Sequence, residues 1–138
     1  MKISFQAVRA GLVLAGLAAG AWSAHAQSAA LPPMKGEGAA RYVCGGIGSD
    51  ESTAMRAAMK DHPLALLFAR RDGAYLADVA VTIRDARGAP ALQLQADGPV
   101  CLIDLPRGRY TVQAASGGAV QKQTVSVGGA PESVDFRF

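Results

Sequence analysis

Few residues in this chain of 138 could do chemistry. It has two cysteines, Cys44 and Cys101, and two histidines, His25 and His62. A serine or cysteine hydrolase needs a base beside its nucleophile, and a structural zinc site needs four suitably spaced thiolate or imidazole ligands. The sequence has neither a nucleophile elbow nor such ligand spacing. We therefore expect no catalytic residue, no metal site and no cofactor, and predict that the protein is not an enzyme.

The densest group of possible ligands lies on a helix predicted over residues 49–61. Met55, Met59 and His62 recur at i, i+4 and i+7 and so share one helix face. Thioether and imidazole ligands suit Cu(I), and Met34 could add a further thioether. Methionine at helical spacing, however, usually fills a core. Core packing is the favoured interpretation, and a small-ligand or copper-handling protein is the alternative.

The first 26 residues have the organisation of a secretory signal peptide. Lys2 and Arg9 accompany an apolar run over 11–21, and an Ala-His-Ala sequence ending at Ala26 matches a cleavage site. The apolar run is shorter than the roughly 20 residues of a membrane-spanning helix. We expect cleavage after Ala26, no membrane span in the mature chain, and a periplasmic location, with secretion as the alternative.

The mature chain would be one domain of nearly balanced charge. Removing 26 residues leaves 112, which suits a single domain, and lowers the formal net charge from +3 to +1. The local concentrations of basic residues are Arg70 with Arg71, and Arg107 with Arg109, and both flank turns. A nucleic-acid site requires clustered basic residues with stacking aromatics. We expect these arginines to be solvated loop charges and expect no nucleic-acid partner.

Cys44 and Cys101 are predicted to form a disulfide. The expected compartment is oxidising, the chain has no third cysteine, and each of the two lies in a predicted strand. Two alternatives are open. One is a metal-binding pair, although two thiols and a distant histidine lack zinc-ligand spacing. The other is a buried pair of free thiols.

The remaining sequence predicts a mostly β fold. Residues 27–40 contain two prolines and two glycines without periodicity, and we expect a flexible leader there. The folded domain is expected over 41–138, with Ser49 as the N-cap of the helix at 49–61. Short alternating strands are separated by turn signals about every 8–12 residues. We predict an antiparallel β-sandwich of seven to eight strands with one short N-terminal helix.

The strand pattern also predicts the core. The apolar run 64–69 indicates a buried strand. In later strands, apolar residues alternate with polar ones, and the apolar positions should face inward. These positions are Ala77, Val79, Val81, Ile83, Leu92, Leu94, Cys101, Ile103, Leu105, Tyr110, Val112, Ala114, Val125, Val127, Val134, Phe136 and Phe138.

Two segments of the second half carry spaced turn residues. They are Ala77-Asp78-Val79-x-Val81-x-Ile83-x-Asp85-x-x-Gly88 and Leu105-Pro106-Arg107-Gly108-Arg109-Tyr110-Thr111-Val112. Through these segments, residues 74–127 resemble the carboxypeptidase regulatory-like domain, a transthyretin-like β-sandwich. The resemblance implies a sandwich without a catalytic site. We therefore expect a non-enzymatic binding or accessory module, which contacts another envelope protein.

The second of these segments is a structural turn motif whose chemistry can be followed. It consists of Leu105, Pro106, Gly108 and Tyr110. Pro106 presets φ at a turn, and Gly108 tolerates positive φ. Tyr110 can bury its ring while its hydroxyl finds a backbone partner.

Overall fold

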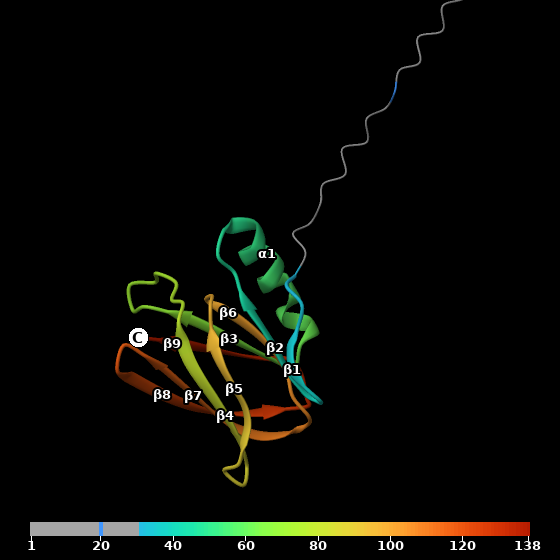
Figure 1. Cartoon of the computed structure of the whole chain (residues 1–138), viewed down its shortest axis with the longest axis vertical. Coiled ribbons are helices and arrows are strands. Elements are labelled where there is room, and N and C mark those ends of the chain that lie inside the picture. The colour runs from blue at the N-terminus through green and yellow to red at the C-terminus, as the bar shows by residue number, and fades with distance from the viewer. Residues whose placement is uncertain (1–19, 21–30) are drawn as a thin grey trace, which may run out of the picture.

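A computed structural model describes Gly20 and residues 31–138 of the protein. These residues form two β-sheets and one short helix (Figure 1). The predicted signal peptide at 1–26, apart from Gly20, and its cleavage point after Ala26 lie outside the described residues. None of the described helical segments combines the length and apolar character that a membrane span requires.

The two sheets pack face to face and make the fold mostly β, as predicted (Figure 1). Sheet A has the order β1-β2-β6-β3-β9, and sheet B has the order β5-β4-β7-β8. Neighbouring strands are antiparallel except β3 and β9, which are parallel. The strands of sheet A are β1 (Lys35–Glu37), β2 (Ala40–Gly45), β3 (Leu64–Ala69), β6 (Val100–Asp104) and β9 (Glu132–Arg137). Those of sheet B are β4 (Val79–Asp85), β5 (Pro90–Ala96), β7 (Gly108–Ser116) and β8 (Ala119–Val127).

Strand β1 departs from the expected domain boundary. The described residues contain nine strands instead of seven or eight. The additional strand, β1, lies inside the segment 27–40, which we expected to be a flexible leader. It pairs with β2 through Lys35–Tyr42, the first of three consecutive pairs. The expected start of the folded domain at Arg41 was therefore wrong, because the sheet already begins at Lys35.

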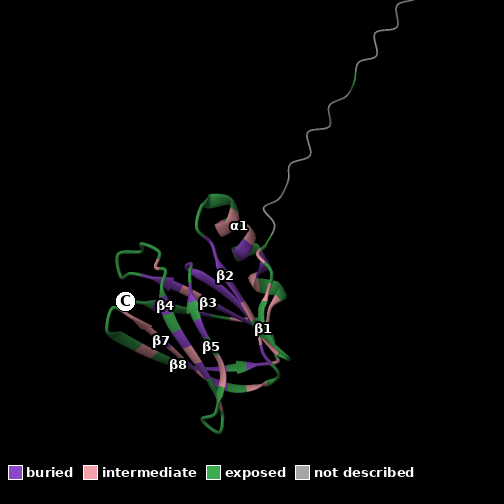
Figure 2. Ribbon diagram, viewed as in Figure 1, coloured by how far each residue is buried: buried purple, intermediate pink, exposed green. Residues whose placement is uncertain are grey.

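The main core lies between the sheets (Figure 2). Nearly all the positions predicted to face inward are buried, and Leu92 and Phe138 are partly buried. Ala77 is the exception, since it is exposed. Strand β4 begins only at Val79, because the preceding Asp78 has φ 60, which is outside the extended region. The predicted series of inward-facing residues therefore begins two residues too early, at Ala77 instead of Val79.

A second core lies on the other face of sheet A, beneath helix α1 (Ser49–Ala58) and the 3-10 turn η1 (Met59–Asp61). Together they cover the range predicted for the helix. Met55 and Ala58 of the helix are buried. They pack against residues of β2, β3 and β6, namely Val43, Ala65, Val100 and Leu102. The fold therefore has three layers: the helix, sheet A and sheet B.

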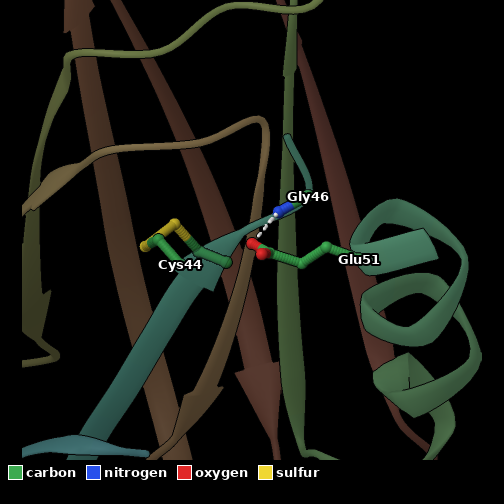
Figure 3. Close-up of a disulfide and its surroundings, with 4 residues drawn as sticks. Cys44, Gly46 and Glu51 are labelled. Atoms are coloured by element: carbon green, nitrogen blue, oxygen red, sulfur yellow. Dashed lines mark hydrogen bonds between the residues drawn. A yellow bond between two sulfur atoms is a disulfide. The ribbon is translucent and has the colours of Figure 1, made fainter. Parts of the chain in front are cut away.

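The start of the helix differs from the expected N-cap. Ser49 is already helical, the cap position is occupied by Gly48, and no side chain caps the helix there. Gly48 has φ 87, a conformation that suits glycine. Instead, the Glu51 carboxylate accepts a hydrogen bond of 2.8 Å from the backbone N–H of Gly46 (Figure 3). A Cβ at Gly45 would overlap with this carboxylate.

Two glutamines connect the edges of the sheets. The side-chain amides of Gln121 and Gln123 on β8 donate to backbone carbonyl oxygens of β9, those of Arg137 and Asp135 respectively. Strand β9 is the last strand of sheet A and pairs with β3 on one side only. The two glutamines therefore occupy acceptors on its open side.

The predicted disulfide is confirmed. Cys44 and Cys101 are directly opposite each other in the β2–β6 pair, with their Cα atoms 4.1 Å apart (Figure 3). Both are buried in the core between the sheets. The bond joins residues 57 positions apart. It thereby attaches the segment before the helix to the strand at the centre of sheet A.

Removing the disulfide should cost much of the stability of the domain. In the chain-entropy model, closing a loop of this length contributes about 4 kcal/mol. We expect the double substitution Cys44→Ala, Cys101→Ala to lower the free energy of unfolding by about that amount, measured by urea denaturation. The unsubstituted protein should lose a similar amount on reduction, whereas the double variant should not respond to the reductant. An unchanged midpoint in the double variant would contradict this account.

Candidate functional site

Leu105 and Tyr110 of the turn motif belong to the core between the sheets. Leu105 is buried, and Tyr110 is only 6% exposed. The Tyr110 hydroxyl donates a hydrogen bond of 2.7 Å to the carbonyl oxygen of Pro106. The expectation of positive φ at Gly108 was wrong. This glycine instead opens β7 beside the tyrosine ring, where an added Cβ would lie 3.6 Å from Cε2.

The possible ligands on the helix are separated into two environments. Met55 is fully buried, and Met34 and Met59 are partly buried against the same cluster beneath the helix. His62 does not belong to that cluster. Its Nδ1 lies 2.7 Å from Oδ1 of Asp104 on β6. Within residues 31–138, no three side chains of the His, Cys, Asp and Glu types are grouped so that they could hold a metal ion.

A groove beside the helix contains an aromatic side chain that is largely exposed to solvent. We call it the helix-side groove. It has a volume of about 300 Å³ and is lined by residues of α1, β3, β9 and the loop after β3, including Arg56, Leu67, Tyr75, Asp135 and Arg137. Tyr75 is 59% exposed. Nothing in the local sequence shows that this segment passes beside the helix.

Arg56 and Tyr75 contact each other in this groove. The Arg56 Nη2 donates a hydrogen bond of 2.6 Å to the Tyr75 hydroxyl, and its Cζ lies 5.1 Å from the centroid of the ring. A guanidinium at this distance is attracted to the aromatic ring. Nearby, Arg137 Nη2 lies 3.9 Å from Asp135 Oδ2, with both side chains more than half exposed. An ion pair between two exposed side chains is weak. Arg137 can therefore still bind an incoming group, as can Arg56.

A second concave surface lies at one end of sheet B. Arg84 and Arg87, from the end of β4 and the following turn, lie there with Arg107, just before β7, and Arg109, at the start of β7. From the sequence we expect Arg107 and Arg109 to be a local pair of solvated loop charges. The pairing of Asp85 with Tyr110 between β4 and β7 brings the four arginines to the same end of the sheet.

Comparison of the chain with models of known protein families and with curated protein sequences gives no match. The chemistry of the two concave surfaces is therefore the basis for a functional proposal. One surface combines two arginines with an exposed tyrosine. The other combines four arginines with threonine hydroxyls.

Removing the Tyr110 ring should destabilise the domain. We expect Tyr110→Ala to lower the free energy of unfolding by about 3–5 kcal/mol, the usual cost of deleting a large core aromatic. Tyr110→Phe keeps the ring and removes the hydroxyl that bonds to Pro106, so it should cost only about 1 kcal/mol. Urea denaturation of the two variants measures both losses. Equal stability of the alanine variant and the unsubstituted protein would show that this ring contributes nothing.

The same tyrosine should make stability depend on alkaline pH. Burial, followed by the negative charge of Asp85, raises the pKa of Tyr110 above its ordinary value. The folded state therefore favours the neutral phenol. Its contribution is complete below the ordinary tyrosine pKa of about 10 and is lost as pH rises through the raised pKa. Tyr110→Phe should flatten this alkaline decline, as measured by urea denaturation over a series of pH values.

Proposed function

We propose that the protein is an exported, non-enzymatic binding module that contacts another protein of the cell envelope. The disulfide between Cys44 and Cys101 supports an oxidising compartment. We infer removal of residues 1–26 and a periplasmic location, with secretion as the alternative. In this proposal the sandwich is a rigid scaffold, and its surfaces bind.

We also propose that the sandwich is transthyretin-like and related to the carboxypeptidase regulatory-like domain. This proposal is supported by the two segments that carry the resemblance, because they lie on the adjacent strands β4 and β7. The Asp85 carboxylate accepts hydrogen bonds from the backbone N–H groups of Arg87, at 2.9 Å, and Ala89, at 3.0 Å. Gly88 has φ 82 in this turn. These contacts give a physical reason for the Asp-x-x-Gly spacing.

The exposed pair of Arg56 and Tyr75 is the observation that carries the proposed contact with a partner. Arginine and tyrosine are enriched among the residues that contribute most to protein interfaces. Arg56 is already held by Tyr75 in the free protein. It would lose less side-chain freedom on binding than an unrestrained arginine. The pair is therefore suited to anchor a partner in the helix-side groove.

The charge around the groove indicates the chemistry of that partner. Arg56 and Arg137 line the groove with a single carboxylate, that of Asp135. A hydrophobic side chain, Leu67, also lines it and is partly exposed. A partner segment would match this surface if it carried carboxylates for the arginines and an apolar side chain for Leu67. We propose an acidic segment of another envelope protein as the occupant.

Crosslinking in cells tests this proposal. A photoreactive phenylalanine analogue at Tyr75 should capture one envelope protein, identified by mass spectrometry. The same analogue at Val120, which is 54% exposed on sheet B, is the matched control and should not capture it. The captured protein, once purified, should bind the unsubstituted domain through an acidic segment. Equal capture from both positions would refute a specific groove.

A charge reversal separates the groove from general surface charge. We expect Arg56→Glu to weaken binding of the purified partner by about tenfold or more, since a charged contact contributes about 1.5–3 kcal/mol. Arg41→Glu, at an exposed position on β2, should have little effect. If Arg41→Glu weakened binding more than Arg56→Glu, or if neither substitution weakened it, the groove would be refuted as the docking surface.

A second candidate is the handling of Cu(I). The observation in its favour is that Met34 joins Met55 and Met59 in one cluster, so that three thioethers gather beneath the helix. His62 lies outside this cluster, with its Nδ1 hydrogen-bonded to Asp104, so under this candidate the thioethers would be the ligands.

Copper titration tests the second candidate. Anaerobic titration with Cu(I) should then show stoichiometric binding that is lost in Met59→Leu. This substitution conserves volume and should cost less than about 1.5 kcal/mol in stability. Val120→Leu, on an exposed surface away from the methionines, should bind Cu(I) normally. Equal binding by both variants would exclude the methionine cluster as the site.

A further inference from the structure

The four arginines at the end of sheet B surround an open hollow. The larger part has a volume of about 560 Å³ and includes Arg84, Arg109, Thr111 and Thr124 in its lining. An adjoining part of about 230 Å³ adds Arg87 and Arg107, and shares Arg109 and Asp85 with the first. A volume of this size is within the range of small-molecule sites.

The positive charge of this hollow is not neutralised within the described part of the chain. None of its four arginines takes part in the ion pairs found there. Asp85 is the single carboxylate in the lining, and its Oδ1 already accepts two backbone hydrogen bonds. The lining therefore carries four guanidinium groups against one carboxylate, an arrangement that attracts an anion.

Two of the arginines are held in place without losing their charge. Arg84 Nη1 donates a hydrogen bond of 3.1 Å to the carbonyl oxygen of Gly88. Arg107 Nη2 donates one of 2.6 Å to the carbonyl oxygen of Gly128. Each guanidinium retains further donors. Prior ordering of this kind reduces the entropy that a side chain loses when a ligand binds.

Hydroxyl groups adjoin the arginines on the outer face of sheet B. Arg84 is opposite Thr111 in the β4–β7 pair, and Thr111 is opposite Thr124 in the β7–β8 pair. These three residues therefore form a row across the sheet on one face. Arg109, two residues before Thr111, lies on the same face in the next row. Guanidinium donors and hydroxyls thus share one surface.

We propose that this hollow binds a phosphorylated saccharide. Guanidinium groups bind phosphate oxygens through paired hydrogen bonds. The hydroxyls of Thr111 and Thr124 and the remaining acceptor capacity of Asp85 suit sugar hydroxyls, which both donate and accept. The hollow is much larger than a phosphate ion, so it has room for the sugar. The saccharide can be free or can form the headgroup of an envelope lipid.

Calorimetric titration at low ionic strength tests the ligand class. Glucose 1-phosphate should bind at one site and more tightly than inorganic phosphate, and glucose should not bind detectably. Equal affinities for glucose 1-phosphate and inorganic phosphate would overturn the saccharide assignment. Vesicles of phosphatidylcholine containing lipid A, a phosphorylated disaccharide lipid, test the membrane source. No saturable binding of either the soluble sugar phosphate or these vesicles would overturn the proposal.

Substitutions locate the site. Arg84→Ala and Arg109→Ala should each weaken binding of the sugar phosphate or of the lipid A vesicles by about tenfold or more. Arg84→Lys should also weaken it, because lysine keeps the charge but cannot form the paired contact. Arg41→Ala is the matched control and should bind normally. Thermal unfolding checks that the variants fold. Undiminished binding in both alanine variants, or equal binding of vesicles containing phosphatidylglycerol, would refute the proposal.

The site is independent of the helix-side groove. Its lining shares no residue with that of the groove. Arg56→Glu should therefore leave binding of glucose 1-phosphate unchanged. A loss of sugar-phosphate binding in that variant would contradict the assignment to sheet B.

Discussion

Strand β6 is apolar on both faces, and this constraint determines the layers of the molecule. Cys101 and Ile103 face the core between the sheets, whereas Val100 and Leu102 face the opposite side of sheet A. Burying a side chain such as leucine or valine contributes about 1.5–3 kcal/mol. If Val100 and Leu102 stayed exposed to water, this stabilisation would be lost. Helix α1 covers them, so the helix completes a core that sheet B alone cannot close.

The position of the helix then determines the surface beside it. The disulfide connects β2 to β6 just before the helix begins. The turn before β6 approaches β2 so closely that a Cβ at Gly98 would overlap with the backbone of Gly45. These contacts hold the start of the helix against the sheet. Arg56, on the exposed side of the helix, can then meet Tyr75 from the loop after β3. The helix-side groove therefore forms because helix α1 covers β6.

Local sequence patterns predicted the elements well and the surfaces poorly. The alternation of apolar residues anticipated most of the buried positions, and elimination among two cysteines anticipated their bond. Strand β1 has three exposed residues and no apolar pattern, so nothing in its sequence indicated a strand. Arg84 and Arg109 lie 25 positions apart in the numbering. Their proximity depends on the pairing of β4 with β7, and periodicity within one segment does not reveal which strands pair.

The glutamine contacts at the edge of β9 also affect the behaviour of the protein when it is crowded. An unpaired edge strand offers a row of backbone groups to which a second chain can add, and this is a common route to aggregation. Gln121 and Gln123 occupy carbonyl oxygens on that edge. Lys122 lies between them on β8 and is itself exposed, so it adds a charge that disfavours strand addition. The open edge of β9 is therefore less available for strand addition by a second copy.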